Sequence, residues 1–210
     1  MGSGRDLVVP LAAAADRPSD LIGGKGRTLG RLIEAGFWVP DGFCITVEAD
    51  ERFVAAHDLT ATIQMELGRK PLAEMRWEEI WDAALRIRSA FLAAPMPDDL
   101  AEPVVAAFRE LGADSLAVRS SAPGEDGSER SHAGLHESLV GVRGEKELLD
   151  AVRIVWASLW SDAALLYRKE LGMDIFRSRM AVVVQGFVAA DLSGVGFGID
   201  PRYPARDHSM

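Results

Sequence analysis

Hydrophobic residues occur along the chain in two patterns: short continuous runs, and longer stripes with helical spacing. The short runs are bounded by glycine, proline, serine or aspartate, which is typical of β-strands. They predict strands at 7–11, 43–47, 115–119, 135–142, 180–188 and 195–199. The first of these is expected at a sheet edge. The last two are expected to form a hairpin that turns around residues 189–194.

Longer segments carry apolar residues at the spacing of an amphipathic helix. They predict helices at 76–94 and 98–111, and one or two helices over 145–171. The first of these segments places five apolar residues near one face, and helical spacing favours a core stripe over a ligand-binding box. We therefore expect the following residues to be buried: Trp77, Ile80, Trp81, Ala84 and Phe91.

Composition and charge narrow the possible function classes. The chain has 210 residues, a formal net charge of -9 and a pI of about 5.0. An acidic chain is a poor candidate for nonspecific nucleic-acid binding, which needs a basic face, although a local basic pocket for a phosphorylated small molecule remains compatible. No apolar stretch is long enough to span a bilayer, so no membrane partner is expected. Residues 1–4 lack the features of a signal peptide and could belong to a tag.

The single cysteine, Cys44, cannot form an internal disulfide, and no cluster of cysteine and histidine indicates zinc. Cys44 lies in the apolar run 43–47, where a buried thiol is the expected state. These observations fit a reducing, cytoplasmic setting.

The glycine-rich segment Gly23-Gly24-Lys25-Gly26 is expected to open a helix that ends at Gly36. Glycines allow close approach of a phosphate, a helix start offers N–H groups, and Lys25 adds a positive charge. Gly26 stands where a Walker A motif has serine or threonine, so that motif is excluded. Taken alone, a glycine-rich turn with a solvated lysine explains the segment equally well.

A second polar segment follows the strand at 115–119. Arg119 stands at the strand end and is followed by two serines, which suits binding of an anionic group of oxygens. The stretch 120–133 reads as a long loop, and long ordered loops are often functional. Glu125 and Asp126 in this loop could bind magnesium, but solvated loop acids are favoured by composition. His132 and His136 are separated by Gly134, which argues against a helical zinc pair.

Gln185 interrupts the apolar run 180–188. A buried amide needs a hydrogen-bond partner, which could be the backbone or a ligand base. The backbone is the simpler choice.

In order and spacing, these segments resemble one family. The resemblance is carried by Gly23–Gly26, Val39-Pro40-Asp41-Gly42-Phe43, Ala117–Ala122, Ala133-Gly134, Val184-Gln185, Ser193-Gly194-Val195 and Asp200-Pro201. The chain is similar, from about residue 21 to residue 201, to the nucleotide-binding domain shared by phosphoenolpyruvate synthase, pyruvate phosphate dikinase and rifampicin phosphotransferase. The resemblance implies an α+β fold, an ATP-grasp-type N-terminal lobe in which a mixed sheet packs against helices. It also implies an extension at 1–20, the domain at 21–201 and a tail at 202–210.

The resemblance further implies a function. The family transfers the β-phosphoryl group of ATP to a histidine on a swivelling domain, and then to pyruvate or another acceptor. Carried over by position, Arg119 holds the transferring phosphate as the catalytic residue and Lys25 binds phosphate. Gly134 and Ser138 are lid contacts, and Gln185 lies beside the adenine. ATP and Mg²⁺ are the expected cofactors.

Some features depart from the family pattern. Pro123-Gly124 replaces the more usual Thr-Ala, and Ser138 stands where threonine is common. The second ATP-grasp lobe, the carboxylates that bind Mg²⁺ and the phosphohistidine domain are expected outside this sequence, either in a longer parent chain or in a partner. The alternative is a catalytically inactive nucleotide-binding or interaction module. The final acceptor cannot be read from this part of the family, because fold does not settle substrate.

Overall fold

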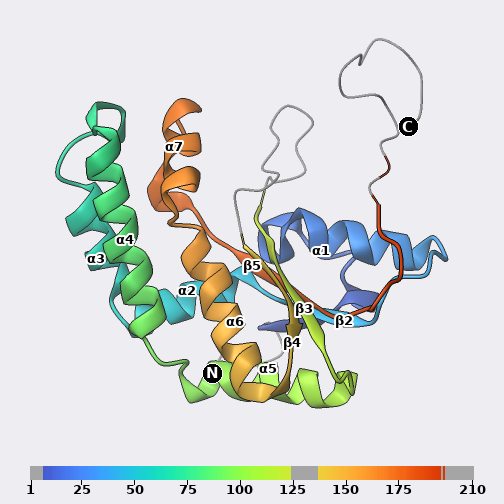
Figure 1. The fold of residues 1–210 in the computed structure, drawn as a ribbon. Coiled ribbons are helices and arrows are strands. Elements are labelled where there is room, and N and C mark those ends of the chain that lie inside the picture. The colour runs from blue at the N-terminus through green and yellow to red at the C-terminus, as the bar shows by residue number, and fades with distance from the viewer. Residues whose placement is uncertain (1–6, 124–136, 195, 197–210) are drawn as a thin grey trace, which may run out of the picture.

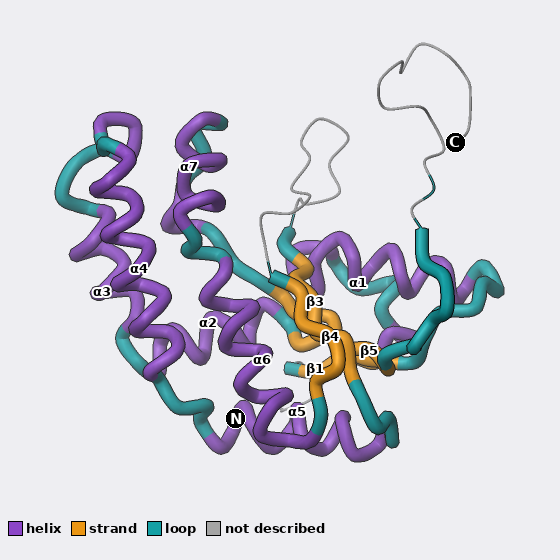
Figure 2. Tube along the Cα trace, in the orientation of Figure 1, coloured by secondary structure: helices purple, strands orange, loops and turns teal. Residues whose placement is uncertain are grey.

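A five-stranded sheet lies at the centre of the molecule (Figures 1 and 2). The structure is a computed structural model that describes residues 7–123, 137–194 and 196. Within these residues the strands are ordered β1-β2-β5-β3-β4. Their bounds are β1 Val8–Pro10, β2 Gly42–Ile45, β3 Leu116–Ser121, β4 Ser138–Val142 and β5 Ala181–Gly186.

The α+β class is confirmed, but the expectation of a mixed sheet is wrong for the described strands. All four strand pairings are antiparallel. Strands β2 and β3 do run in the same direction, since both are antiparallel to β5. Because β5 lies between them, they do not form a parallel pair.

Helices cover the two faces of the sheet unequally. One face is covered by α1 (Ser19–Glu34), together with the short 3-10 turn η1 (Leu11–Ala13), and we call it the α1 face. On the opposite face, the α2–α7 face, α2, α5 and α6 contact the strands, and α3, α4 and α7 pack against these helices and one another (Figure 1). Their bounds are α2 Val47–Ala56, α3 Leu59–Leu67, η2 Leu72–Glu74, α4 Trp77–Ala93, α5 Asp98–Leu111, α6 Gly144–Ser158, α7 Asp162–Glu170 and η3 Ile175–Arg177.

Because successive side chains of a strand point to opposite faces of the sheet, a separate hydrophobic core forms on each face. On the α2–α7 face, Val182 and Val184 of β5 join a large cluster that contains tilted pairs of aromatic rings. The ring centroids of Phe53 and Trp156 lie 5.1 Å apart, and those of Phe53 and Phe91 lie 5.9 Å apart. On the α1 face, Val183 packs in a smaller cluster with Ile22 and Cys44. The predicted burial of Cys44 is confirmed.

The predicted core stripe of α4 is only partly correct. Ile80, Ala84 and Phe91 are buried as expected, but the side chains of Trp77 and Trp81 are 57% and 47% exposed. The buried residues continue at spacings of three and four, whereas the two tryptophans form the neighbouring row, one turn apart. That row is exposed to solvent, although it is as apolar as the buried row beside it.

Several element boundaries differ from prediction. The segment 145–171 forms two helices, and the edge position of β1 is confirmed. β3 continues through Ser121, so the loop predicted from residue 120 begins later, whereas Val47 begins α2 instead of ending a strand. No prediction covered α2 and α3. The hairpin partner predicted at 195–199 lies almost wholly outside the described residues. Strand β5 is already bonded to β2 on one side and β3 on the other.

Candidate functional site

The glycine-rich segment sits at a sharp bend inside α1. Gly23 has φ 72° and ψ 170°, a conformation that is essentially restricted to glycine. One turn of helix precedes this bend, and the main part of α1 begins at Gly24. The prediction that this segment opens a helix is therefore confirmed for the longer part of α1.

The bend is tied to the end of β3 by Ser121. Its Oγ donates a hydrogen bond to the carbonyl oxygen of Ile22 at 2.8 Å and accepts one from the N–H of Gly26 at 3.1 Å. The N–H of Gly24 donates to the carbonyl oxygen of Ala122 at 3.4 Å. A Cβ at Gly23 would lie 2.0 Å from the carbonyl oxygen of Ser121. These glycines therefore allow α1 to approach β3 closely.

This geometry corrects the hypothesis of free N–H groups at the helix start. The N–H groups of Gly24 and Gly26 are both engaged by the end of β3. The hydroxyl of Ser121 is buried and used in the same contact, so it is not available to an anion without breaking that contact. None of these three hydrogen bonds uses the side chain of Lys25. Its side chain is half-buried and lies one residue before Gly26.

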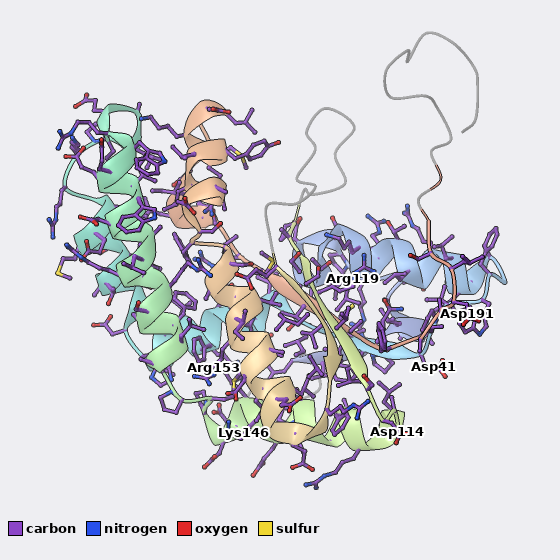
Figure 3. All side chains as sticks on the ribbon, in the orientation of Figure 1. Asp41, Asp114, Arg119, Lys146, Arg153 and Asp191 are labelled. Carbon is purple, nitrogen blue, oxygen red and sulfur yellow. The ribbon has the colours of Figure 1, made fainter. Side chains whose placement is uncertain are left out.

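Arg119 points to the α1 face of the sheet. Leu116 and Val118 belong to the core on the α2–α7 face, so the alternate residues of β3 face α1. Figure 3 shows the Arg119 side chain on that side, close to α1. Among the described residues, its guanidinium takes part in no hydrogen bond or ion pair. A half-buried arginine that has no counter-ion among the described residues is suited to hold an anionic ligand.

Ser138 and Gln185 lie on the same face as Arg119. Ser138 is directly opposite Arg119 across the β3–β4 pair. Directly opposed residues of antiparallel strands have Cβ atoms roughly 4.5–5.5 Å apart, and diagonal neighbours lie roughly 7–8 Å apart. Gln185 is opposite Ala117, two residues before Arg119, and is therefore a diagonal neighbour. The sheet thus brings three of the predicted residues together.

The partner of Gln185 is the backbone. Its Nε2 donates a hydrogen bond to the carbonyl oxygen of Pro40 at 3.1 Å, and the residue is only 5% exposed. The simpler of the two predicted alternatives is therefore realised for the amide nitrogen. The bond fixes the loop before β2 against the centre of the sheet.

An exposed apolar residue adjoins these polar groups and was missed by the sequence analysis. Val140 lies opposite Ala117 on the α1 face and is 64% exposed, although it belongs to a strand. Ser138 is exposed as well, so α1 leaves the β4 edge of this face uncovered. The available signal was alternation, because Val140 follows Ser138 by two residues and must share its face. We call Ala117, Arg119, Ser138, Val140 and Gln185 the β3–β4 shelf.

Several predicted positions lie outside the described residues. They are Gly134, the acids Glu125 and Asp126, and the histidines His132 and His136. In the described part of the chain, no group of three or more histidine, cysteine, aspartate or glutamate side chains is arranged to hold a metal ion. Burial raises the pKa of the Cys44 thiol to about 12, so this thiol is a packing residue that stays protonated. No described helix has the length and apolar character needed to cross a membrane.

Comparison with known proteins assigns the chain to a family. The model of the family "Pyruvate phosphate dikinase, AMP/ATP-binding domain" matches residues 19–210. A phosphoenolpyruvate synthase of Aeropyrum pernix is 43% identical over 187 residues, which cover 86% of this chain and 23% of the relative. A rifampicin phosphotransferase of a Streptomyces species is 38% identical over 201 residues, covering 95% of this chain and 23% of the relative.

A third relative is matched over similar shares of both chains. A probable phosphoenolpyruvate synthase of Pyrococcus horikoshii is 32% identical, and the match covers 90% of this chain and 28% of the relative. The chain therefore spans about a quarter of the length of the curated relatives that it matches. The chain belongs to the family of the pyruvate phosphate dikinase AMP/ATP-binding domain.

Proposed function

We propose that this chain supplies one wall of the ATP site of a dikinase-type phosphotransferase. In this proposal, the β-phosphoryl group of ATP passes to a histidine on a swivelling domain, and then to pyruvate or another acceptor. Membership of an AMP/ATP-binding family supports the nucleotide, and relatives that include phosphoenolpyruvate synthases and rifampicin phosphotransferases support phosphoryl transfer.

The observation that carries the proposal is the β3–β4 shelf. It combines a half-buried Arg119 that lacks a partner among the described residues with an exposed apolar Val140 on the next strand. A nucleotide has the same two parts, a flat apolar base and a charged phosphate chain. We assign the phosphates to Arg119 and Lys25, and the base to the part of the shelf near Val140 and Gln185.

The proposed roles follow from what each side chain can do. Arg119 neutralises charge on the transferring phosphate and orients it, because phosphoryl transfer depends mostly on positioning and electrostatic stabilisation. Lys25 adds a second positive charge at the start of the longer part of α1. Ser138 can donate a hydroxyl hydrogen bond from the neighbouring strand, and Gly134 is proposed as its companion in a lid. Gln185 retains Oε1 as an acceptor beside the base.

Mg²⁺ is proposed to bridge the phosphates and to supply additional charge neutralisation. The described residues offer no cluster of three or more potential metal ligands, so they do not fit a complete metal site. We propose that the metal carboxylates, the second ATP-grasp lobe and the acceptor histidine come from a longer parent or a partner chain. The chain by itself is then expected to bind ATP weakly and not to turn it over.

Calorimetric titration of the purified chain with ATP, with and without Mg²⁺, tests the proposal. Loss of a charge-assisted contact in Lys25→Ala is expected to weaken binding by about 1.5–3 kcal/mol. Arg109→Ala is the matched control, because Arg109 is exposed on α5 and pairs with Glu145 away from the shelf.

Release of AMP and phosphate from ATP, with and without pyruvate, is measured in parallel. Unchanged ATP affinity in Lys25→Ala would remove this residue from the site. Turnover by the chain that is abolished by Arg119→Ala would show that the catalytic carboxylates are already present. Absence of any nucleotide binding to the folded chain would favour an interaction module.

A further inference from the structure

A buried arginine on helix α7 has unusual surroundings. Arg168, on α7, is only 5% exposed. Its Nε donates to the carbonyl oxygen of Ala164 at 3.0 Å, and one Nη donates to the Oγ of Ser178 at 2.8 Å. The other Nη, Nη2, is buried without a hydrogen-bond partner in the described structure. Its guanidinium carbon lies 5.5 Å from the centre of the Trp160 ring.

The charge of Arg168 is not balanced within the described residues. None of the ion pairs found among them includes Arg168, and both of its identified acceptors are neutral. Burial lowers the pKa of Arg168 to about 10, so the guanidinium still carries its charge at neutral pH. Removing a charge from water without a counter-ion is costly, and buried charges in proteins are normally paired.

Arg153 provides a direct contrast on the neighbouring helix α6. It is also largely shielded, with a side chain that is 18% exposed. However, its guanidinium forms an ion pair with Asp150, and Nη1 donates to the carbonyl oxygens of Leu92 and Ala94 at 2.7 and 2.8 Å. In the described structure the shielded Arg153 therefore has a carboxylate partner, whereas Arg168 has none.

A cavity of about 320 Å³ adjoins Arg168. Its polar lining contains two further arginines, and the rest of its wall is mainly apolar. The ionisable and hydroxyl groups on its wall are Tyr167, Arg168, Asp174, Arg177, Ser178 and Arg179.

Two of the three arginines on this wall are already paired. Nε of Arg177 lies 3.4 Å from the Asp174 carboxylate, and Nε of Arg179 lies 2.9 Å from that of Glu51. Arg168 is left as the positive charge without a carboxylate in the described structure.

We propose that this cavity binds a small oxyanion, a phosphate or carboxylate group, as the counter-ion of Arg168. The hydroxyl of Ser178, which accepts from Arg168 and still has its own proton to donate, and the exposed guanidinium of Arg177 supply further donors on the same wall. The apolar remainder of the wall favours a compact ligand whose charge is concentrated at one end. The Asp174 carboxylate repels an anion, and its pairing with Arg177 reduces that repulsion.

This site differs from the one proposed for ATP. None of Lys25, Arg119, Ser138 or Gln185 lines the cavity. Its described wall is built from α7, the η3 segment with the residues beside it, Leu159, and Ala122 and Pro123 directly after β3. None of these residues belongs to the β3–β4 shelf. The inference therefore goes beyond the nucleotide-binding role and can fail independently of it.

The test is a titration of the ¹⁵N-labelled chain with inorganic phosphate and, separately, with acetate. Ionic strength is held constant with sodium chloride, and the side-chain Nε–H signals of the arginines are followed by NMR. The Nε–H of Arg168 is protected by its bond to Ala164, and Arg168→Gln identifies the signal. We expect a saturable shift for Arg168 and no saturable shift for Arg153. The two arms show whether phosphate or carboxylate is preferred.

A second variant tests the proposal without changing the buried Arg168, whose substitution could prevent folding. Arg177→Glu reverses a charge on a side chain that is 88% exposed, so the chain should still fold. Binding of the anion is expected to weaken by roughly tenfold or more, because a charge-assisted donor becomes a repelling group. Arg119→Ala should leave the phosphate titration of Arg168 unchanged.

Three outcomes would overturn the proposal. They are no saturable shift of Arg168 beyond that caused by chloride, an equal shift of Arg153, and an unchanged affinity in Arg177→Glu.

Discussion

The two faces of the sheet use the same five strands for different purposes. On the α2–α7 face, large apolar side chains fill the space, and the rings of Phe53, Phe91 and Trp156 are in contact. On the α1 face, close approach depends on missing side chains, and Gly23 meets the end of β3 where no Cβ could fit. The first face is built for stability. The second combines a small core with an uncovered shelf that carries Arg119 and Val140.

Mutations on the two faces should therefore separate stability from binding. Substitutions that add or remove buried side-chain volume on the α2–α7 face should change the free energy of unfolding. Changes on the shelf should change ligand affinity while the fold persists. Gly23 packs against the end of β3 close to the shelf, so its substitution could affect both stability and ligand binding.

The largest effect is expected for Phe91→Ala on the α2–α7 face. Phe91 is fully buried, and truncation of such an aromatic ring leaves a cavity that costs about 3–5 kcal/mol. Leu85→Ala on the same helix is the control, because Leu85 is 54% exposed and its loss should cost less than about 0.5 kcal/mol. Urea unfolding measures both. Equal destabilisation by the two variants would show that the buried face of α4 is wrongly assigned.

Gly23→Ala should lower stability by roughly 2–3 kcal/mol, from its unfavourable conformation and a backbone clash together. A new Cβ would lie 2.0 Å from a main-chain oxygen of β3, which cannot move as a flexible side chain can. Gly36→Ala has a similarly positive φ of 80° but meets no atom within 4 Å, so it should cost only about 1 kcal/mol. Thermal unfolding of the pair isolates the clash, and equal losses would argue against close packing of α1 on β3.

Asp50 makes stability depend on pH from within the α2–α7 face. Burial raises the pKa of Asp50 from 3.8 to about 7 and Glu51 adds to the rise, although the N–H of Met180 and the charge of Arg179 oppose it. Between these two values the folded chain keeps a proton that the unfolded chain has lost. The free energy of unfolding therefore falls as pH rises through this window, by at most about 1.4 kcal/mol per pH unit.

Asp50→Asn should flatten this dependence, because the amide oxygen can still accept from Met180 without becoming charged. Asp114→Asn, at an exposed loop position, should leave the slope unchanged. Urea unfolding from pH 4.5 to pH 7.5 makes the comparison. A slope that is the same in the wild type and in Asp50→Asn would assign the pH dependence to other groups.

Arg119→Lys should change ligand binding with little change in stability. A guanidinium can contact two phosphate oxygens at once, whereas an ammonium is a single point charge, so ATP affinity should fall roughly tenfold. Arg109→Lys at the exposed pair with Glu145 is the control for a general charge effect. Calorimetry with ATP distinguishes the two variants. Full ATP affinity in Arg119→Lys would refute a bidentate role.

Much of the fold could be predicted because local patterns were strong. Helix α5 was predicted with the bounds that the structure gives, and the apolar run that forms β5 was predicted two residues too long at its end and one at its start. The order of strands could not be predicted, since β5 enters the centre of the sheet between strands that precede it in sequence. The exposed Trp77 and Trp81 show that helical spacing does not reveal which row of a broad apolar surface faces the core.

The site could be predicted in its residue types and only partly in its geometry. The family resemblance singled out Arg119, Ser138 and Gln185, and strand register brings them onto one face. Their roles toward ATP stay predictions. The engagement of Gly24 and Gly26 by the end of β3 could not be foreseen, because it depends on contacts between segments almost a hundred residues apart. Val140 was overlooked because an apolar residue in a strand is ordinarily a core residue.

The most direct test of the shelf compares two valines on adjacent strands that face opposite sides of the sheet. Val140 is exposed on the α1 face, and Val118 is fully buried on the α2–α7 face. The methyl signals of the ¹³C-labelled chain are followed by NMR during titration with ATP and Mg²⁺. We predict a saturable shift of the Val140 methyl groups and a much smaller change at Val118. No saturable change at Val140, or equal changes at both valines, would contradict nucleotide binding on the β3–β4 shelf.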